Sequence, residues 1–203
     1  MKLNEVMKYP GQTIGGFWKK TGYAWFYILY DTKKAGLAIA DDWAEAEDFI
    51  IGGLGIGQIT NDTHPAGEEW KIGSVAAESG YGPILYYIAM ATHGYVRSDL
   101  NVSTDAQHIW NTFSSLEKQG KNIKKKPSYK ESSMSYGPAF KFAYTVTGPL
   151  RIKIIDLMRK AKINHQNFLN DMSELREFNK PLSTKRIESY ISSGAHSYVN
   201  SQL

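Results

Sequence analysis

The sequence of 203 residues contains no cysteine. It therefore has no disulfide, no cysteine-ligated metal site and no thiol nucleophile. Its five histidines show no metal-binding spacing such as His-Glu-x-x-His, so we expect no metal. No apolar run reaches the ~18 residues of a membrane span, and the N-terminal stretch MKLNEVMKYPGQT lacks the apolar core of a signal peptide. We expect a soluble, cytoplasmic protein without a membrane partner.

The composition is that of a globular protein, with 42% hydrophobic, 22% charged and 13% aromatic residues. This length suits one domain with an extension, or two small domains. A formal net charge of +4 is too small to require nucleic acid. The lysine-rich run 121–126 is more typical of a solvated loop than of a phosphate-binding surface. We do not expect nucleic acid as a partner.

The first half of the chain indicates mainly strands. Residues 23–30 (YAWFYILY) are aromatic and β-branched, and residues 70–77 (WKIGSVAA) alternate along their length, so both predict strands. Residues 37–40 (LAIA) and 56–59 are shorter candidates for strands. Residues 41–50 have the apolar spacing of a short amphipathic helix.

The second half predicts helices that alternate with strands. A buried helix is expected from Ile84 to about His93, with Pro83 at its first position, and an amphipathic helix over 104–118 with Ser103 as its N-cap. The other expected elements are strands at 95–99 and 139–146, an exposed loop over 118–135, a helix from about 150 that breaks at NHQN (164–167) before a second piece to 178, and a helix from Ser183. This order is typical of an α/β or α+β fold with a mixed sheet.

The stretch VAAESGYGPILYYIAM (75–90) joins a strand to a buried helix through a glycine-rich turn. The first N–H groups of a helix have no partner within it, and the helix dipole places partial positive charge there. Glycines at positions 80 and 82 let a ligand approach the backbone closely. This turn is therefore a candidate anion site.

Two families of phosphate-binding loops fit this turn poorly. A Walker A loop needs Gly-Lys-Ser/Thr at its end, but Gly82 is followed by proline and isoleucine. A dinucleotide-binding fingerprint needs a third small residue where Leu85 stands. Asp99 lies near the spacing of the ribose-binding acid of that fingerprint, which does not offset the misfit at Leu85.

The stretch resembles motif A of the GNAT superfamily, the GCN5-related N-acetyltransferases. That family carries Gln/Arg-x-x-Gly-x-Gly/Ala after its fourth strand, and here residues 77–82 read AESGYG. The family continues with a strand and a helix that bears Asn-x-x-Ala-x-x-x-Tyr, and here Ser103, Ala106 and Trp110 stand at those spacings. The resemblance covers about residues 69–113, extends loosely back to 23–60 and leaves out 148–203. A group of bacteriophage proteins with this fold is similar in the same motifs.

The resemblance implies a mixed, mostly antiparallel sheet flanked by helices over residues 1–147, an acyl-CoA-binding domain, with residues 148–203 as a helical C-terminal extension. It implies acetyl-CoA as co-substrate and acetyl transfer to an amine acceptor, a small molecule or a protein. The backbone of the glycine turn would hold the pyrophosphate. The residues expected at the cofactor are Val75, Ala77, Glu78, Ser79, Gly80, Tyr81, Gly82, Pro83, Ser103 and Trp110.

Acetyl transfer to an amine needs a base, which in this family usually lies on the strands before the glycine turn. Glu68 and Glu69 occupy such a position, and Asp99 follows the next expected strand. These are the candidate catalytic residues. The alternative is that the two glutamates are solvated loop carboxylates and that Asp99 caps the following turn.

An alternative without catalysis follows from three departures from the family pattern. Ala77 replaces the leading Gln/Arg, Trp110 replaces a tyrosine that protonates the thiolate, and Glu78 places a carboxylate in the loop. The chain would then be a binding or structural protein with the same fold, of a bacteriophage if the phage resemblance holds, in the host cytoplasm or the virion. The C-terminal helices would pack on a protein partner or on a second copy.

Overall fold

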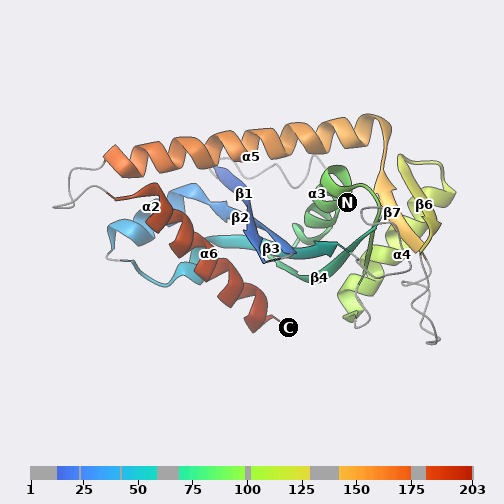
Figure 1. Cartoon of the computed structure of the whole chain (residues 1–203), viewed down its shortest axis with the longest axis horizontal. Coiled ribbons are helices and arrows are strands. Elements are labelled where there is room, and N and C mark those ends of the chain that lie inside the picture. The colour runs from blue at the N-terminus through green and yellow to red at the C-terminus, as the bar shows by residue number, and fades with distance from the viewer. Residues whose placement is uncertain are drawn as a thin grey trace.

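The structure is a computed structural model that describes residues 13–22, 24–41, 43–58, 69–98, 102–128, 142–174 and 182–202. Within these residues seven strands form one sheet in the order β1-β2-β3-β4-β5-β7-β6 (Figure 1). The strands are β1 (Ile14–Thr21), β2 (Ala24–Asp31), β3 (Ile50–Gln58), β4 (Trp70–Ala77), β5 (Val96–Ser98), β6 (Ile123–Pro127) and β7 (Phe142–Val146). Only the β4–β5 pair is parallel among them. The expected mixed, mostly antiparallel sheet is confirmed.

Helices cover both faces of this sheet (Figure 1). They are α2 (Thr32–Ala40), α3 (Gly82–His93), α4 (Thr104–Lys118), α5 (Gly148–Glu174) and α6 (Thr184–Ser201), with a 3-10 turn η1 (Ala46–Phe49). The expected caps hold, because the Ser103 and Ser183 hydroxyls accept hydrogen bonds from the Ala106 and Arg186 N–H groups. In the described part of the chain no helix is long and apolar enough to cross a membrane.

Two buried clusters lie on the two faces of the sheet, as the two-residue period of a strand requires. Tyr27 and Leu29 of β2 belong to the cluster under α3, α4 and the first half of α5. Phe26, Ile28 and Tyr30 belong to the cluster under α2, α6 and the second half of α5. Helix α5 therefore passes around the β1 edge and contributes to both clusters. Residues 148–203, where described, pack on the sheet.

Four local predictions are wrong. Residues 37–40 lie in α2 instead of a strand, because the Asp31 carboxylate accepts hydrogen bonds from the Lys33 and Lys34 N–H groups and starts a helix there. In the expected helix 41–50, the described residues form only the 3-10 turn η1.

The other two errors concern the lysine-rich segment and α5. Residues 123–127 of the expected loop form β6, which pairs with β7, and the Lys125 ammonium lies 4.9 Å from the Phe142 ring centroid. Helix α5 does not break at NHQN. Its Asn164 amide donates to the Ile14 carbonyl, and His165 is buried against the sheet, so both side chains point inward from a continuous helix.

Candidate functional site

Strands β4 and β5 begin side by side and then part. They pair at three positions, which end with Ile72 against Ser98. On the other side of β4, the register with β3 shifts between Gly55 and Ile56, so that Gly73 is an extra residue in the ladder. Such a bulge bends a strand locally. After Ile72, β4 has no described partner strand on the β5 side, and we call the opening at this point the wedge.

The wedge holds a hollow of about 80 Å³. It is lined by Ile72, Gly73, Ser74, Val75, Tyr86, Ser98, Val102, Ser103, Ala106 and Trp110. The Tyr86 and Trp110 rings meet edge to face, with centroids 5.3 Å apart. Trp110 is only 2% exposed, and its Nε1–H has no hydrogen-bond partner in the described structure. A hollow of this size suits a slender chain and leaves one buried donor in its wall.

The glycine turn adjoins the wedge. Val75 lines the wedge, and the turn begins three residues later along the chain, at Glu78. The Glu78 N–H donates to the Ile51 carbonyl at 2.8 Å, and the Tyr81 N–H donates to the Glu78 carbonyl at 3.0 Å. Among the described residues, the N–H groups of Ser79, Gly80 and Gly82 have no such bond. They stand at the start of α3, where the helix dipole favours an anion.

Gly80 fixes the shape of this turn. Its φ of 93° is a conformation that other residues rarely adopt. A Cβ atom at Gly80 would meet nothing within 4 Å, so the backbone there is open to a ligand. The carboxylate of the neighbouring Glu78 acts on Tyr198 of α6, whose pKa is raised by burial first and by this charge second. Glu78 is exposed, on the side of the turn that faces α6.

The structure brings several expected cofactor residues together and, of the catalytic candidates, describes only Glu69. Val75, Ser103 and Trp110 line the wedge, while Ala77, Tyr81 and Pro83 belong to the end of β4, the turn and the start of α3. Glu68 and Asp99 lie outside the described residues.

Glu69 is not a solvated loop carboxylate. It is 3% exposed, accepts a hydrogen bond from the Ser128 hydroxyl at 2.8 Å and lies 3.7 Å from the Lys126 ammonium. It precedes Ile72 by three residues, which places it about 10 Å along β4 from the wedge.

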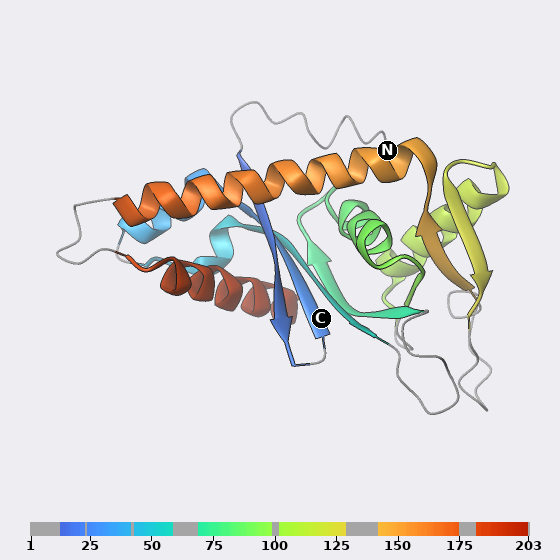
Figure 2. The same cartoon turned by 45° about the horizontal axis from the view of Figure 1, so that its top comes forward.

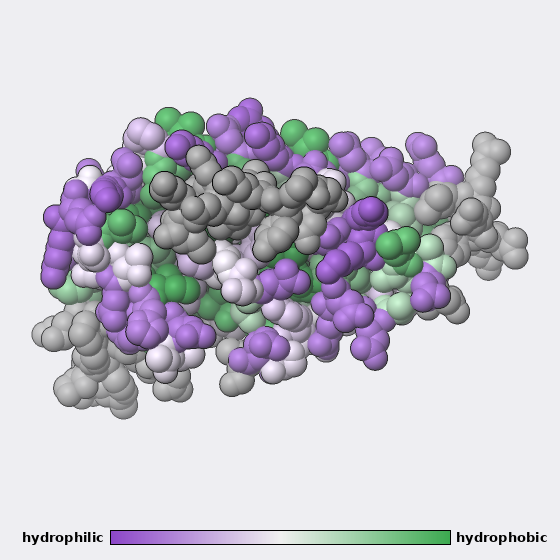
Figure 3. Space-filling view, turned by 180° about the vertical axis from the view of Figure 1, so that it is seen from behind, coloured by the Kyte–Doolittle hydropathy of each residue, from purple (hydrophilic) through white to green (hydrophobic). Residues whose placement is uncertain are grey.

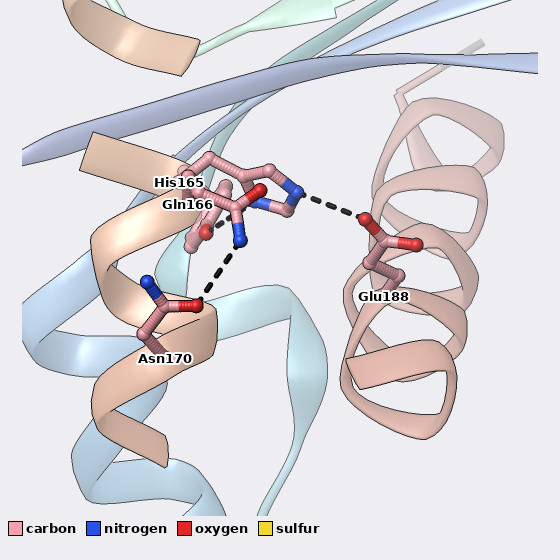
Figure 4. Close-up of polar contacts among 5 residues, drawn as sticks. His165, Gln166, Asn170 and Glu188 are labelled. Carbon is pink, nitrogen blue, oxygen red and sulfur yellow. Dashed lines mark hydrogen bonds and ion pairs between the residues drawn. The ribbon is translucent and has the colours of Figure 1, made fainter. Parts of the chain in front are cut away.

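A second polar cluster joins β2, α5 and α6 (Figure 4). The Tyr30 hydroxyl lies 2.8 Å from His165 Nδ1, and His165 Nε2 lies 3.1 Å from a Glu188 carboxylate oxygen. The Phe17 ring stacks on the imidazole at 4.3 Å. Burial lowers the pKa of His165, an effect that Glu188 opposes, and burial raises the pKa of Tyr30.

A neutral imidazole satisfies this geometry, with Nε2–H donating to Glu188 and Nδ1 accepting from Tyr30. The cluster attaches both C-terminal helices to the sheet. Sequence reasoning missed it because Tyr30 and His165 are 135 positions apart, and no local pattern links residues at such a separation.

Among the described residues, no group of three or more His, Asp or Glu side chains is placed to hold a metal ion. Neither a family model, nor a curated protein, nor a solved structure matches the chain. The wedge and the glycine turn are therefore the candidate functional site on geometric grounds alone.

Proposed function

We propose that the chain binds an acyl-coenzyme A such as acetyl-CoA, with the acyl-bearing arm in the wedge and the pyrophosphate on the N–H groups of Ser79, Gly80 and Gly82. One observation carries the proposal. Val75, Ser103, Ala106 and Trp110, which the GNAT resemblance assigns to the cofactor or its motif, line a single hollow. That hollow adjoins a glycine turn which follows the fourth strand.

The backbone of β4 supplies the remaining contacts. After Ile72, β4 pairs with β3 on one side, and no described strand pairs with it on the β5 side. An extended arm that carries amide groups can pair with this backbone as another strand would. A Cβ atom at Gly73 would meet nothing within 4 Å, so the wall is open at the bulge.

The proposed reaction is acetyl transfer to an amine. The amine nitrogen attacks the thioester carbonyl, a C–N bond forms, the C–S bond breaks, and the amine proton passes to a base. Tyr86 lines the wedge, and burial raises the pKa of its hydroxyl, so it stays protonated and donates a hydrogen bond to the departing thiolate. Glu69 would accept the amine proton through a chain of several waters, because it lies about 10 Å along the strand direction from the wedge.

The test is calorimetric titration of acetyl-CoA and CoA into the purified protein and two glycine variants. Gly73→Trp fills the wedge. Gly57→Trp is the matched control, because a Cβ atom at Gly57 also meets nothing within 4 Å and this strand residue lies outside the wedge. We expect micromolar binding in the wild type and the control, and none in Gly73→Trp. No heat and no thermal stabilisation at millimolar CoA would contradict the proposal.

A CoA-binding protein without transfer is the second candidate, and Trp110 favours it because an indole N–H does not protonate a thiolate. Release of free thiol from acetyl-CoA in the presence of a panel of amines separates the two candidates. Transfer that depends on Tyr86, tested with Tyr86→Phe, supports the enzyme. Binding without thiol release from any amine supports the binding protein.

A further inference from the structure

Strand β1 forms one edge of the sheet, with β2 as its described neighbour. The Thr32 N–H donates to the Thr13 carbonyl, so Thr13 faces β2. Backbone groups alternate in direction along a strand, and those of Ile14, Gly16, Trp18 and Lys20 therefore point outward. Of these, the Ile14 carbonyl accepts a hydrogen bond from the Asn164 side-chain amide of α5 at 2.9 Å. The outward N–H and C=O groups of Gly16, Trp18 and Lys20 have no partner in the described part of the chain.

A groove of about 910 Å³ runs along this edge. Figure 2 shows α5 crossing over the start of β1, with α6 on one side of the strand and α3 on the other. The residues that line the groove come from five elements: Gly16 to Lys19 of β1, Tyr27 of β2, Ala91 and Thr92 of α3, the middle of α5 and the first turns of α6. Unlike a bare sheet edge, this edge lies at the base of a formed cleft.

The two walls of the groove differ in chemistry. Trp18, Tyr27, Ala91 and Met158 make the wall on the α3 side apolar. The wall on the α6 side carries Lys19, Lys185, Ser189 and Glu188, the last of which is engaged by His165. Arg159 and Lys162 of α5 add two further cations, and Asp156 pairs with Arg159. Positive charge is therefore in excess on the rim and the α6 wall.

Two buried polar atoms in the apolar wall lack partners within the described structure. Tyr27 is 2% exposed, and neither its hydroxyl nor Trp18 Nε1 has a hydrogen bond. The Tyr27 hydroxyl lies beside the outward-facing backbone of Gly16, 2.8 Å from the position that a Cβ atom would take there. A buried hydroxyl without a partner costs free energy unless a ligand or another group supplies one.

We propose that an extended acidic segment of a partner protein adds to β1 as an eighth strand of the sheet. Its backbone pairs with Gly16, Trp18 and Lys20. Successive side chains of an added strand point to opposite walls, so the segment alternates apolar residues toward Trp18 and Met158 with carboxylates toward Lys19 and Lys185. This is recognition by strand addition, with affinity from the backbone and specificity from the two walls.

Charge argues against a second copy of this chain as the occupant. Pairing of two β1 strands would set two grooves against each other, each with an excess of positive charge from Lys19, Lys162 and Lys185, and like charges that face each other are destabilising. The outer face of α5 carries further apolar side chains: Ile152 and Ile163 are exposed and do not line the groove, and Figure 3 shows apolar side chains along the upper rim where α5 runs. In the described part of the chain nothing covers that face.

The test uses a fluorescein-labelled peptide of about ten residues, alternating valine and glutamate, long enough for one strand. Lys20→Pro removes an outward N–H and leaves the pairing of β1 with β2 intact, since proline is tolerated at such edge positions. Lys20→Ala is the matched control, because it loses the same charge and keeps the N–H. We expect Lys20→Pro to weaken binding about fivefold or more relative to Lys20→Ala.

Amide hydrogen exchange provides the second readout. Peptide binding should slow exchange at Trp18 and Lys20 and leave Phe17 and Lys19, which already face β2, unchanged. Equal affinity of Lys20→Pro and Lys20→Ala, unchanged exchange at Trp18, or equal binding of a valine–lysine peptide would each overturn the proposal. So would failure of the acidic peptide to bind at millimolar concentration. A dimer that Lys20→Pro dissociates would assign the edge to a second copy and overturn the proposal as well.

Discussion

The wedge between β4 and β5 and the groove along β1 are both openings beside a strand whose backbone lacks a partner on one side. The wedge is built from residues 72–110, a continuous part of the chain in which a bulge at Gly73 separates two strands. The groove joins β1 near the start of the chain to α3 in its middle and to α5 and α6 near its end, so it depends on helices that are far from β1 in the sequence. A local feature of the chain, the bulge at Gly73, lies at the first opening, whereas tertiary packing of helices against β1 forms the second.

This difference has a chemical consequence. The wedge is narrow, holds about 80 Å³ and adjoins the free N–H groups of a helix start, so it suits a slender chain attached to phosphate. The groove holds about 910 Å³, has a cationic wall and exposes a strand edge, so it suits a peptide. Substitutions that damage one opening should leave ligand binding at the other unchanged.

Truncation of Trp110 in the wall of the wedge should lower the unfolding free energy more than any other change described below. Trp110 is 2% exposed and contacts Tyr86, Phe113 and Tyr144. Trp110→Ala should lower the free energy of unfolding by about 4 kcal/mol, measured by urea denaturation. Trp110→Phe should cost much less because the ring contacts remain. Similar losses for the two variants would contradict the packing described for the wedge.

A methyl group at the contact between α6 and η1 should destabilise the packing of α6 on the rest of the fold. A Cβ atom at Gly194 would lie 2.5 Å from the Ala46 Cβ and 2.7 Å from its carbonyl oxygen. Gly194→Ala should therefore cost about 3 kcal/mol of unfolding free energy, at the upper end for overpacking. Gly36→Ala is the control: its nearest atom is 3.7 Å away, and alanine in a helix should stabilise by about 0.5–1 kcal/mol. A neutral Gly194→Ala would show that α6 does not pack closely there.

Acid should weaken the fold through His93, which lies near the groove. Burial between Trp18 and Trp70 lowers the pKa of His93 to about 4. The unfolded chain, with a pKa near 6.5, binds more protons between these values, so stability falls as pH decreases from about 6.5 to 4. With solvent screening at this half-buried site we expect a loss of about 1–2 kcal/mol. His93→Gln should flatten the pH dependence of the unfolding free energy measured with urea. If the pH dependence were unchanged in this variant, it would arise from other groups.

A charge reversal in the groove should have the smallest effect on stability. Lys185→Glu should leave the unfolding free energy within about 0.5 kcal/mol and weaken the acidic peptide about threefold. Lys153→Glu is the matched control, since Lys153 is exposed on α5 outside the groove. Fluorescence anisotropy of the labelled peptide measures peptide binding to both variants. Equal weakening by the two variants would mean that the attraction comes from overall charge.

The sequence predicted the helices and the glycine turn beside the wedge, but neither the wedge itself nor the groove. Pro83, Gly94 and Ser103 are local signals for the ends of helices: in the structure Pro83 lies in the first turn of α3, Gly94 caps its end, and Ser103 caps the start of α4. The bulge at Gly73 gave no sequence signal, because a glycine within a strand has several meanings. Strand β6 was missed because its Lys124–Lys126 side chains look like a loop until β7 supplies a partner.

Longer-range features were beyond sequence reasoning. The interaction of His165 with Tyr30 and Glu188 joins three elements, and no periodic pattern reports it. The same holds for Glu69, whose burial depends on Ser128 and Lys126. Local turn and cap chemistry can be predicted from adjacent residues, whereas the partners of a buried polar group are set by the tertiary fold.

The most direct test of the account is amide-resolved NMR of the protein with saturating acetyl-CoA. If the turn holds the pyrophosphate, the amide signals of Ser79, Gly80 and Gly82 shift and their hydrogen exchange slows. Those of Gly16, Trp18 and Lys20 stay as they were, because they belong to the other opening. Shifts confined to the groove, or none at the turn under saturating ligand, would contradict the assignment of the wedge and glycine turn to coenzyme A.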